Sequence, residues 1–339
     1  MRIGLVGFGF GGRRFHLPYI QAAEAWELVG VVTRSAARRA ELAEDAPGVP
    51  AVDDLEALLD RGVDVVVITT PPETRRELVL AALARGVHVV ADKPFAPTAD
   101  GGRELAAAAR EAGLLLTVFH NRRWDTDLRT LAGVLESGEL GPVRRAVSRF
   151  DVDEPDTLEA GPAHGLLRDL GSHQVDQMTH LFGSVVRVDA HLDHVRVDGQ
   201  DVDAGYVLGL HHRDGVFSQV TASKVFHLTE RELTIHAERG SYVSRMTDVQ
   251  TEQILAGEHP GTAENWGVED EERWGVISTA AGRRAVPSAV GDYAEFYREL
   301  HAALAAGRGF SVTLEQAVHT LEILDAARTA DAEGRSVPL

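Results

Sequence analysis

The stretch of sequence that decides the fold lies at the start of the chain, where residues 4–18 read GLVGFGFGGRRFHLP. Glycine fills five of its first nine positions, although glycine gives up more backbone freedom on folding than any other residue. Gly7, Gly9 and Gly12 match the pattern G-x-G-x-x-G, which here follows an apolar run and opens a helix-like segment. In that context the pattern predicts a loop whose bare backbone receives the pyrophosphate of a dinucleotide.

Each glycine of the pattern has a predicted task. Gly7 permits the tight turn, Gly9 lets the backbone approach the pyrophosphate, and Gly12 allows the helix to pack closely on the strand. Gly4 and Gly11 have no assigned task beyond a permissive backbone. The alternative interpretation is a glycine-rich turn that serves the structure only.

The sequence around this loop alternates between apolar runs and amphipathic segments. We expect strands at 2–6, 27–32, 63–69, 87–91 and 114–119, with helices at 36–44, 54–61, 73–85 and 99–112. Apolar strands separated by helices are typical of a parallel sheet that is covered on both faces. The sequence therefore predicts an α/β fold in which residues 1–120 form a Rossmann dinucleotide-binding domain.

The pattern changes after residue 120. We expect helices at 125–136, 291–305 and 313–330, and strands at 143–150, 185–193, 205–211, 216–222, 231–237 and 240–244. Several strands alternate apolar and polar residues, which predicts a sheet with one covered face and one face open to water or to another subunit. Residues 246–289 are polar, acidic and weakly periodic. We assign residues 121–339 to a second, α/β domain.

Composition narrows the classes of function. A chain of 339 residues is long enough for two domains. Its net charge of −18 repels phosphate backbones and anionic lipid, so we expect neither nucleic acid nor a membrane as partner. The absence of cysteine excludes disulfides, thiolate metal ligands and cysteine nucleophiles, and fits a cytoplasmic location.

A lysine follows one of the buried strands. In the stretch VHVVADKPFAPT (87–98), Asp92, Lys93 and Pro94 stand where the strand leaves the sheet. Ligands of open parallel sheets bind beyond the carboxyl ends of the strands, so Lys93 is placed to polarise a carbonyl or alkoxide oxygen. The alternative is a solvated loop lysine. The sequence does not decide whether the Lys93–Pro94 bond is cis.

The most informative segment of the second domain is RDLGSHQVDQMTHLFG (168–183). On a regular helix, Asp169, His173, Asp176 and His180 lie within an arc of about 60°. An aspartate can orient a histidine four residues away, and histidine suits general acid–base catalysis. A solvated helix face would have the same pattern. A metal site is a further alternative, but we expect no metal because a dinucleotide already accounts for the chemistry.

The end of the second predicted strand bears on the choice of dinucleotide. In the stretch GVVTRSAAR (30–38), Thr33, Arg34 and Ser35 occupy the turn where NAD-specific sites carry a carboxylate. Arg34 can pair with a 2′-phosphate through its planar fork, and the hydroxyls can add donors. We therefore expect NADP in preference to NAD. Alternatively, Arg34 and Arg38 are solvated helix residues.

Taken together, these motifs resemble the glucose–fructose oxidoreductase/inositol dehydrogenase/MocA family over nearly the whole chain. The resemblance rests on the glycine pattern, the lysine–proline turn, TTPPETRRELVLAAL (69–83) and DLGSHQVDQ (169–177). HNRRWD (120–125), GELGPV (138–143) and the Trp-Gly pairs 266–267 and 274–275 resemble the branch of NADP-dependent scyllo-inositol dehydrogenases.

The resemblance implies a C-terminal α/β domain with a mostly antiparallel open sheet that forms the interface of a homodimer or homotetramer. It implies catalytic roles for Lys93, Asp169 and His173. Two departures from the family pattern stand out, since Asp92 replaces a glutamate and a glycine triplet is reduced to Gly165. The cofactor-binding residues that it implies are Gly7, Phe8, Gly9, Phe10, Gly11, Gly12, Thr33, Arg34, Ser35, Thr70, Pro71, Asp92, Lys93 and Asn121.

The expected function is that of an NADP-dependent oxidoreductase. It transfers a hydride between the nicotinamide and a carbinol or ketone carbon of a small polyol or sugar, inositol-like in shape. Two alternatives stay open: a dinucleotide-binding regulator without catalysis, and a glycosidase that uses its bound dinucleotide transiently. Trp124, His164 and residues 246–289 are candidates for lining the substrate pocket, but no spacing ties them to a particular sugar.

Overall fold

The computed structural model describes residues 1–161 and 164–339. The chain divides into two compact units, each made of three segments. The N-terminal unit comprises Met1–Asn121, Ile254–Glu264 and Tyr293–Val318, and the C-terminal unit comprises Arg122–Gln253, Asn265–Asp292 and His319–Leu339.

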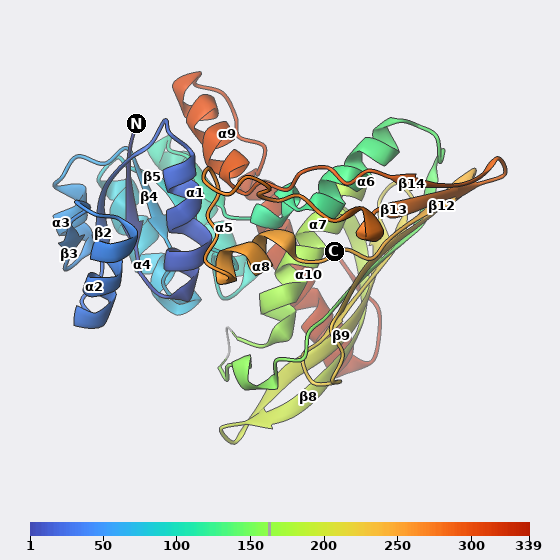
Figure 1. Ribbon diagram of the computed structural model, residues 1–339. Coiled ribbons are helices and arrows are strands. Elements are labelled where there is room, and N and C mark those ends of the chain that lie inside the picture. The colour runs from blue at the N-terminus through green and yellow to red at the C-terminus, as the bar shows by residue number, and fades with distance from the viewer. Residues whose placement is uncertain (162–163) are drawn as a thin grey trace. The chain divides into compact units, whose positions relative to one another are not determined.

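The N-terminal unit contains a parallel sheet of six strands in the order β3-β2-β1-β4-β5-β6, with helices on both faces (Figure 1). Its strands are β1 (Arg2–Val6), β2 (Glu27–Val32), β3 (Ala51–Val52), β4 (Val65–Ile68), β5 (His88–Ala91) and β6 (Leu116–Val118). Its helices are α1 (Leu17–Ala22), α2 (Ala36–Asp45), α3 (Leu55–Leu59), α4 (Pro72–Ala84), α5 (Ala99–Ala112) and α9 (Ala294–Ala305). The predicted Rossmann sheet is confirmed. Strand β3 was not predicted, because two residues carry no periodicity.

Small residues on two neighbouring strands allow a helix to approach the sheet. A Cβ atom at Gly4 would lie 2.7 Å from Cδ2 of Leu58, and one at Gly30 would lie 3.0 Å from Cδ1 of the same side chain. Leu58 of α3 is fully buried at this point. Gly4 therefore has a packing role that the sequence did not reveal.

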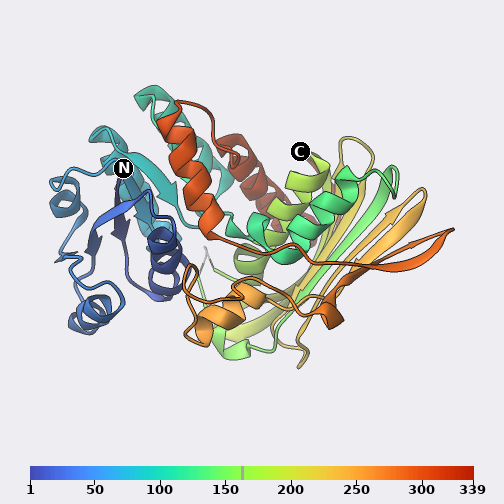
Figure 2. The ribbon, with the colours of Figure 1, turned by 45° about the horizontal axis from the view of Figure 1, so that its top comes forward.

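The C-terminal unit contains a sheet of nine strands in the order β14-β13-β12-β11-β7-β10-β9-β8-β15. Among the described strands, β7 and β10 pair in parallel and the other neighbours pair antiparallel, as predicted. Helices α6 and α7 and the second half of α10 lie along one face of this sheet (Figure 2). The elements are β7 (Val143–Asp151), β8 (Val185–Val197), β9 (Gln200–His212), β10 (Phe217–Ser223), β11 (Glu230–Ala237), β12 (Gly240–Ser244), β13 (Gly275–Thr279), β14 (Gly282–Val286), β15 (Val337–Pro338), α6 (Thr126–Glu136), α7 (Ser172–Phe182) and α10 (Leu314–Glu333).

The acidic segment 246–289 is more ordered than its sequence suggested. It holds helix α8 (Val249–Leu255) and strands β13 and β14, which extend the sheet at one edge. Strand β14 reads GRRAV and is exposed along most of its length. An exposed edge strand lacks the apolar alternation that identifies strands in a sequence, which is why the segment was not assigned strands.

In the part of the chain that the structure describes, no helix is both long enough and apolar enough to span a bilayer.

Candidate active site

The predicted cofactor residues of the N-terminal unit gather at one edge of its sheet. The glycine loop follows β1, Thr33–Ser35 follow β2, Thr70 and Pro71 follow β4, and the Asp92–Lys93 turn follows β5. Because β2, β1, β4 and β5 are adjacent and parallel, their carboxyl ends lie side by side. The strand order reverses between β1 and β4, and dinucleotides bind at such switch points. Asn121 follows β6 at the same edge and is buried.

The backbone of the glycine loop agrees with the tasks predicted for its glycines. Gly7 has a φ of +100°, a conformation that favours glycine. A Cβ atom at Gly12 would lie 2.3 Å from the carbonyl oxygen of Gly7, so this position has no room for a side chain. A Cβ atom at Gly9 would have Nη2 of Arg38 as its nearest neighbour, at 3.8 Å, so the backbone is open on that side.

The two aromatic residues of the loop have different surroundings. Phe8 is 1% exposed, so its side chain belongs to the core and only its backbone faces the loop. Phe10 is 65% exposed and packs edge-on against Phe15, with ring centroids 5.7 Å apart. The chain then enters α1 through a wide π-helical turn, Gly11–His16.

A buried arginine ties two of these loops together. Nε of Arg75 in α4 donates a hydrogen bond to the carbonyl oxygen of Thr70 at 2.6 Å. Its Nη1 donates to the carbonyl oxygens of Asp92 and Pro94. Arg75 therefore fixes the turn that carries Lys93, in which the Lys93–Pro94 bond is cis. This role of Arg75 was not predicted, because the neighbouring Arg76 is exposed and no local pattern distinguishes the two.

The Asp92 carboxylate belongs to the turn that Arg75 holds in place. Its Oδ1 accepts a hydrogen bond from the backbone nitrogen of Lys93 at 2.8 Å, and its Oδ2 lies 3.7 Å from Nε2 of His16. Burial alone would raise the pKa of Asp92, but His16, Arg75 and Lys93 together lower it to about 2. A Cβ atom at Gly11 would lie 3.3 Å from Oδ2, so the glycine leaves space for this carboxylate.

His16 is a second residue whose role was not predicted, although it stands in the opening stretch. It is fully buried, and its Nδ1 lies 2.6 Å from the hydroxyl of Tyr297 in α9. Its ring stacks at a tilt on Phe119, with centroids 4.1 Å apart. His16 thus connects the Asp92 turn to the buried aromatic core of the unit.

The predicted determinant of dinucleotide choice lies at the end of β2. Arg34 is exposed, and among the described residues its guanidinium bonds only the carbonyl oxygen of Asp53, through Nε at 3.0 Å. The Asp53 carboxylate pairs with Arg39 at 2.6 Å. Ser35 caps α2 by accepting a hydrogen bond from the backbone nitrogen of Arg38. The guanidinium of Arg38 lies toward the glycine loop, because its Nη2 is the nearest atom to a Cβ built at Gly9, at 3.8 Å.

In the C-terminal unit the four residues of the predicted polar stripe differ in burial and in their partners. Residues Leu167–Gly171 form a π-helical turn ahead of α7, so Asp169 precedes the regular helix that holds His173, Asp176 and His180. The Asp169 side chain is 45% exposed and His173 is buried. Asp176 is buried in an ion pair with Arg123, whose Nε and Nη2 lie 2.9 and 2.6 Å from its oxygens. His180 is exposed.

The residues ahead of the π-helical turn explain why Gly165 is a glycine. Gly165 has a φ of +97°, and a Cβ atom there would lie 2.4 Å from Oδ2 of Asp203. Oδ1 of Asp203 accepts a hydrogen bond from the backbone nitrogen of Leu167 at 2.6 Å. The carboxylate of β9 therefore fixes the first residues of the turn that presents Asp169.

The histidines of β8 and β9 lie in separate surroundings. His191 and His194 are both exposed, and the pairing of β8 with β9 shifts register between them, where β9 carries one extra residue. His211 and His212 have different surroundings, since His211 is partly exposed beside Asp189 and His212 is buried. Among residues 1–161 and 164–339, no group of three or more His, Asp or Glu side chains is arranged to hold a metal ion.

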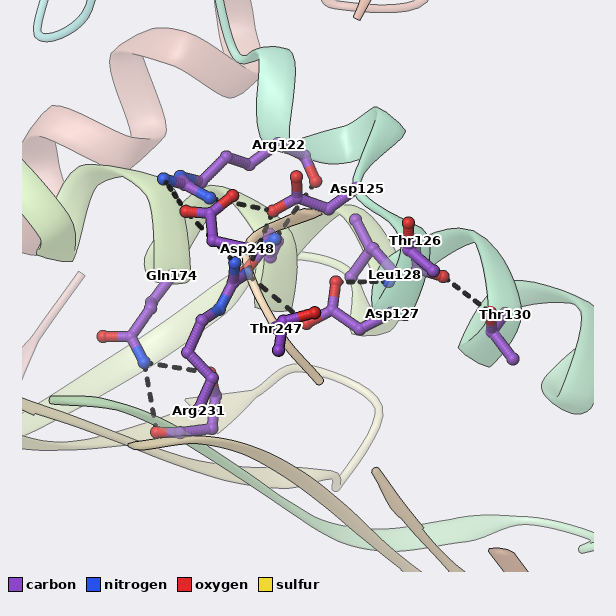
Figure 3. Close-up of polar contacts among 12 residues, drawn as sticks. Arg122, Asp125, Thr126, Asp127, Leu128, Thr130, Gln174, Arg231, Thr247 and Asp248 are labelled. Carbon is purple, nitrogen blue, oxygen red and sulfur yellow. Dashed lines mark hydrogen bonds and ion pairs between the residues drawn. The ribbon is translucent and has the colours of Figure 1, made fainter. Parts of the chain in front are cut away.

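A buried charge cluster occupies the interior of the C-terminal unit (Figure 3). Arg122 contacts Asp125 and Asp248 through Nη1 and Nη2, at 3.1 and 2.8 Å. Arg231 contacts Asp125 at 3.0 Å, Asp248 at 3.4 Å and Asp127 at 3.5 Å. Three carboxylates thus face two guanidinium groups. The charged residues of the HNRRWD stretch have structural partners in this interior.

The surplus carboxylate makes stability depend on pH. Burial raises the pKa of Asp127 to about 6, against the charge of Arg231. The folded state therefore binds the Asp127 proton more tightly than the unfolded state, in which the pKa is 3.8. The protonated carboxyl stabilises the fold at pH values below 3.8, and this stabilisation is lost as the pH rises to about 6. We expect the Asp127→Asn variant to avoid this loss, which amounts to at most about 3 kcal/mol. Protonation of Asp92 and Asp248 changes the free energy of unfolding only at lower pH than this range, because their pKa values are about 2.

Urea unfolding at several pH values between about 4 and 7 measures the effect. The free energy of unfolding of the wild type should fall across the window relative to that of Asp127→Asn. Parallel pH curves for the two proteins would contradict the assignment of surplus charge to Asp127.

Together the two units define an oxidoreductase with an NAD(P)-binding Rossmann domain and an α/β domain. Residues 1–120 match the model described as "Oxidoreductase family, NAD-binding Rossmann fold", and residues 133–339 match "Oxidoreductase family, C-terminal alpha/beta domain". The chain belongs to the glucose–fructose oxidoreductase/inositol dehydrogenase/MocA family, and it is an NAD(P)-dependent oxidoreductase.

Similar proteins extend over the full chain. The scyllo-inositol 2-dehydrogenase (NADP(+)) IolW of Bacillus subtilis is 29% identical over 350 residues, which cover 100% of this chain and 96% of that protein. The uncharacterized oxidoreductase YdgJ of Escherichia coli is 33% identical, with 96% and 94% covered. The solved structure of the oxidoreductase yvaA from Bacillus subtilis superposes with a TM-score of 0.92 at 30% identity, covering 100% of this chain and 98% of that one.

Proposed function

We propose that the protein is an NADP-dependent dehydrogenase or reductase of an inositol-like polyol or sugar. The observation that carries the proposal is the arginine-bearing turn after β2 at the same sheet edge as the Lys93 turn. The full-length likeness to an NADP-dependent scyllo-inositol dehydrogenase supports it. Residues 1–120 would bind the dinucleotide, and residues 121–339 would bind substrate and form the subunit contact. The cysteine-free sequence supports a cytoplasmic location.

Three side chains would perform the reaction. His173 would take the proton of the substrate hydroxyl as the C–O bond becomes a carbonyl, and Lys93 would stabilise the negative charge that develops on the oxygen. Asp169 would orient His173 or hold a neighbouring hydroxyl. The bound dinucleotide supplies the hydride acceptor. In the reverse direction His173 returns the proton to the alkoxide oxygen.

A panel of polyols and sugars, followed by NADPH absorbance in both directions, tests the proposal. Net oxidation or reduction of the dinucleotide with a free polyol supports a dehydrogenase. Glycoside cleavage without net change in NADPH would identify a glycosidase instead. Tight dinucleotide binding without any turnover would identify a regulator.

The open face of the nine-stranded sheet supports the proposed homo-oligomer. Val276, Val243, Thr234, Val147 and Gln219 are in register across five neighbouring strands, so their side chains share one face. None of the five is charged; Thr234 is buried among its neighbours and the other four are partly exposed. A row of this kind suits contact with a second copy. A monomer at micromolar concentration in sedimentation would contradict it.

The choice of dinucleotide gives a separate prediction. We expect Arg34→Ala to weaken NADP binding by about 10-fold or more and to leave NAD binding nearly unchanged, because the lost guanidinium pairs only with the 2′-phosphate. Arg103→Ala removes an exposed arginine that pairs within α5 and is the matched control. Calorimetry with both dinucleotides measures the two affinities. A wild-type protein that binds NAD more tightly than NADP would overturn the assignment.

A further inference from the structure

Lysine is rare in this chain, and one of its lysines has no role in the proposed reaction. Lysine and arginine together number 34, and only Lys93 and Lys224 are lysines. Arginine serves at the other basic positions, and lysine differs from it in carrying a compact ammonium group instead of a planar fork. This compositional contrast is visible in the sequence, but it gains a meaning only from the contacts that Lys224 makes.

Lys224 is buried directly beneath the Asp169 carboxylate. It follows β10 and is 7% exposed, and its backbone nitrogen donates to the carbonyl oxygen of Ala204 at 3.0 Å. Its Nζ donates to Oδ2 of Asp169 at 3.1 Å and to Oγ1 of Thr157 at 2.9 Å. The Asp169 side chain is 45% exposed, whereas that of Lys224 is 8% exposed. The ammonium therefore supports the carboxylate from its buried side.

The neighbouring carboxylates have cations of their own. Asp203 pairs with Arg328 at 3.2 Å, and Asp151 pairs with Arg149 at 2.5 Å. The buried hydroxyl of Tyr206 donates to Oε1 of Gln174. Lys224 forms the corresponding ion pair with Asp169. A buried ammonium without a counter-ion is costly, so Lys224 and a charged Asp169 require each other.

We propose that Lys224 is a positioning residue that keeps the Asp169 carboxylate charged and fixed in orientation. The proposal rests on the proposed function, in which Asp169 orients His173 or holds a substrate hydroxyl. A charged acceptor forms stronger hydrogen bonds than a neutral one, and a fixed one loses less freedom in the transition state. Lys224 acts through Asp169 and has no contact with the reacting atoms.

A double-mutant cycle on the full-length protein tests the proposal, with scyllo-inositol and NADP+ as the probe. We expect Lys224→Met to lower kcat by about 10- to 100-fold, the range found for outer residues that orient metal-binding side chains. NADP+ affinity by calorimetry should be unchanged. In an Asp169→Asn background, Lys224→Met should change kcat by less than about 2-fold. Lys224→Gln, which keeps a hydrogen-bond donor, replaces Lys224→Met if the latter does not fold.

Arg196→Met is the matched control, because it removes a cation from an exposed pair with Asp201 in the same sheet. It should retain wild-type kcat. Wild-type kcat in Lys224→Met, or losses that multiply in the double variant, would overturn the proposal. If the wild type converts neither scyllo-inositol nor any member of the panel, the proposed function fails. In that case the urea midpoints of the wild type, Lys224→Met, Asp169→Asn and the double variant test whether Lys224 and Asp169 are coupled. Non-additive shifts support the pairing, and additive shifts overturn it.

Discussion

Replacing His173 or Lys93 by alanine is expected to lower kcat by at least about 100-fold, within the range usual for acid–base groups. Without His173, no positioned base takes the hydroxyl proton as the hydride leaves. Without Lys93, the charge that develops on the substrate oxygen would lose the cation proposed to stabilise it. These are the largest effects on turnover that the proposed mechanism predicts.

The measurement is steady-state turnover on the best substrate of the polyol panel, with NADP+ affinity determined separately. His180→Ala is the matched control for His173→Ala, since His180 is exposed on the same helix. It should keep wild-type kcat. Near-wild-type turnover in both His173→Ala and Lys93→Ala would remove the proposed assignment of roles.

The second large effect concerns the glycine loop, where two similar substitutions should behave differently. Gly12→Ala places a Cβ atom 2.3 Å from the carbonyl oxygen of Gly7, and this overlap can be relieved only by moving the backbone. We expect it to lower the free energy of unfolding by about 1–3 kcal/mol and to weaken dinucleotide binding. Gly9→Ala meets no atom closer than 3.8 Å, so the fold should be unaffected. Its added methyl group should nonetheless weaken NADP binding by about 10-fold or more, because it fills the approach to the pyrophosphate.

Thermal unfolding and calorimetry separate the two effects. Gly101→Ala, where a Cβ atom would make ordinary contacts at 3.6 Å in α5, is the control for the substitution itself. If Gly9→Ala left NADP affinity at the wild-type level, the pyrophosphate would not approach the loop at Gly9. If Gly12→Ala were as stable as the wild type, movement of the loop would have relieved the overlap with the Gly7 carbonyl.

Local patterns were sufficient for most of the fold. The apolar runs of β1, β4 and β5 and the helical spacing between them predicted the parallel sheet, and the glycine pattern predicted the loop at its edge. These features depend on residues that are close in sequence. The edge strand β14 and the two-residue β3 escaped prediction, because neither carries a periodic apolar pattern.

The sequence by itself determined where a dinucleotide-binding loop stands and which residue types follow each strand. Only the tertiary structure decided which charged groups meet. Asp176 pairs with Arg123, 53 residues away in the sequence. Asp169 contacts Lys224, 55 residues away, and His16 contacts Tyr297 across 281 residues. The physical reason is that helix and strand periodicity arise from neighbours along the chain, whereas the partner of a buried charge depends on which strands lie side by side once the sheet has formed.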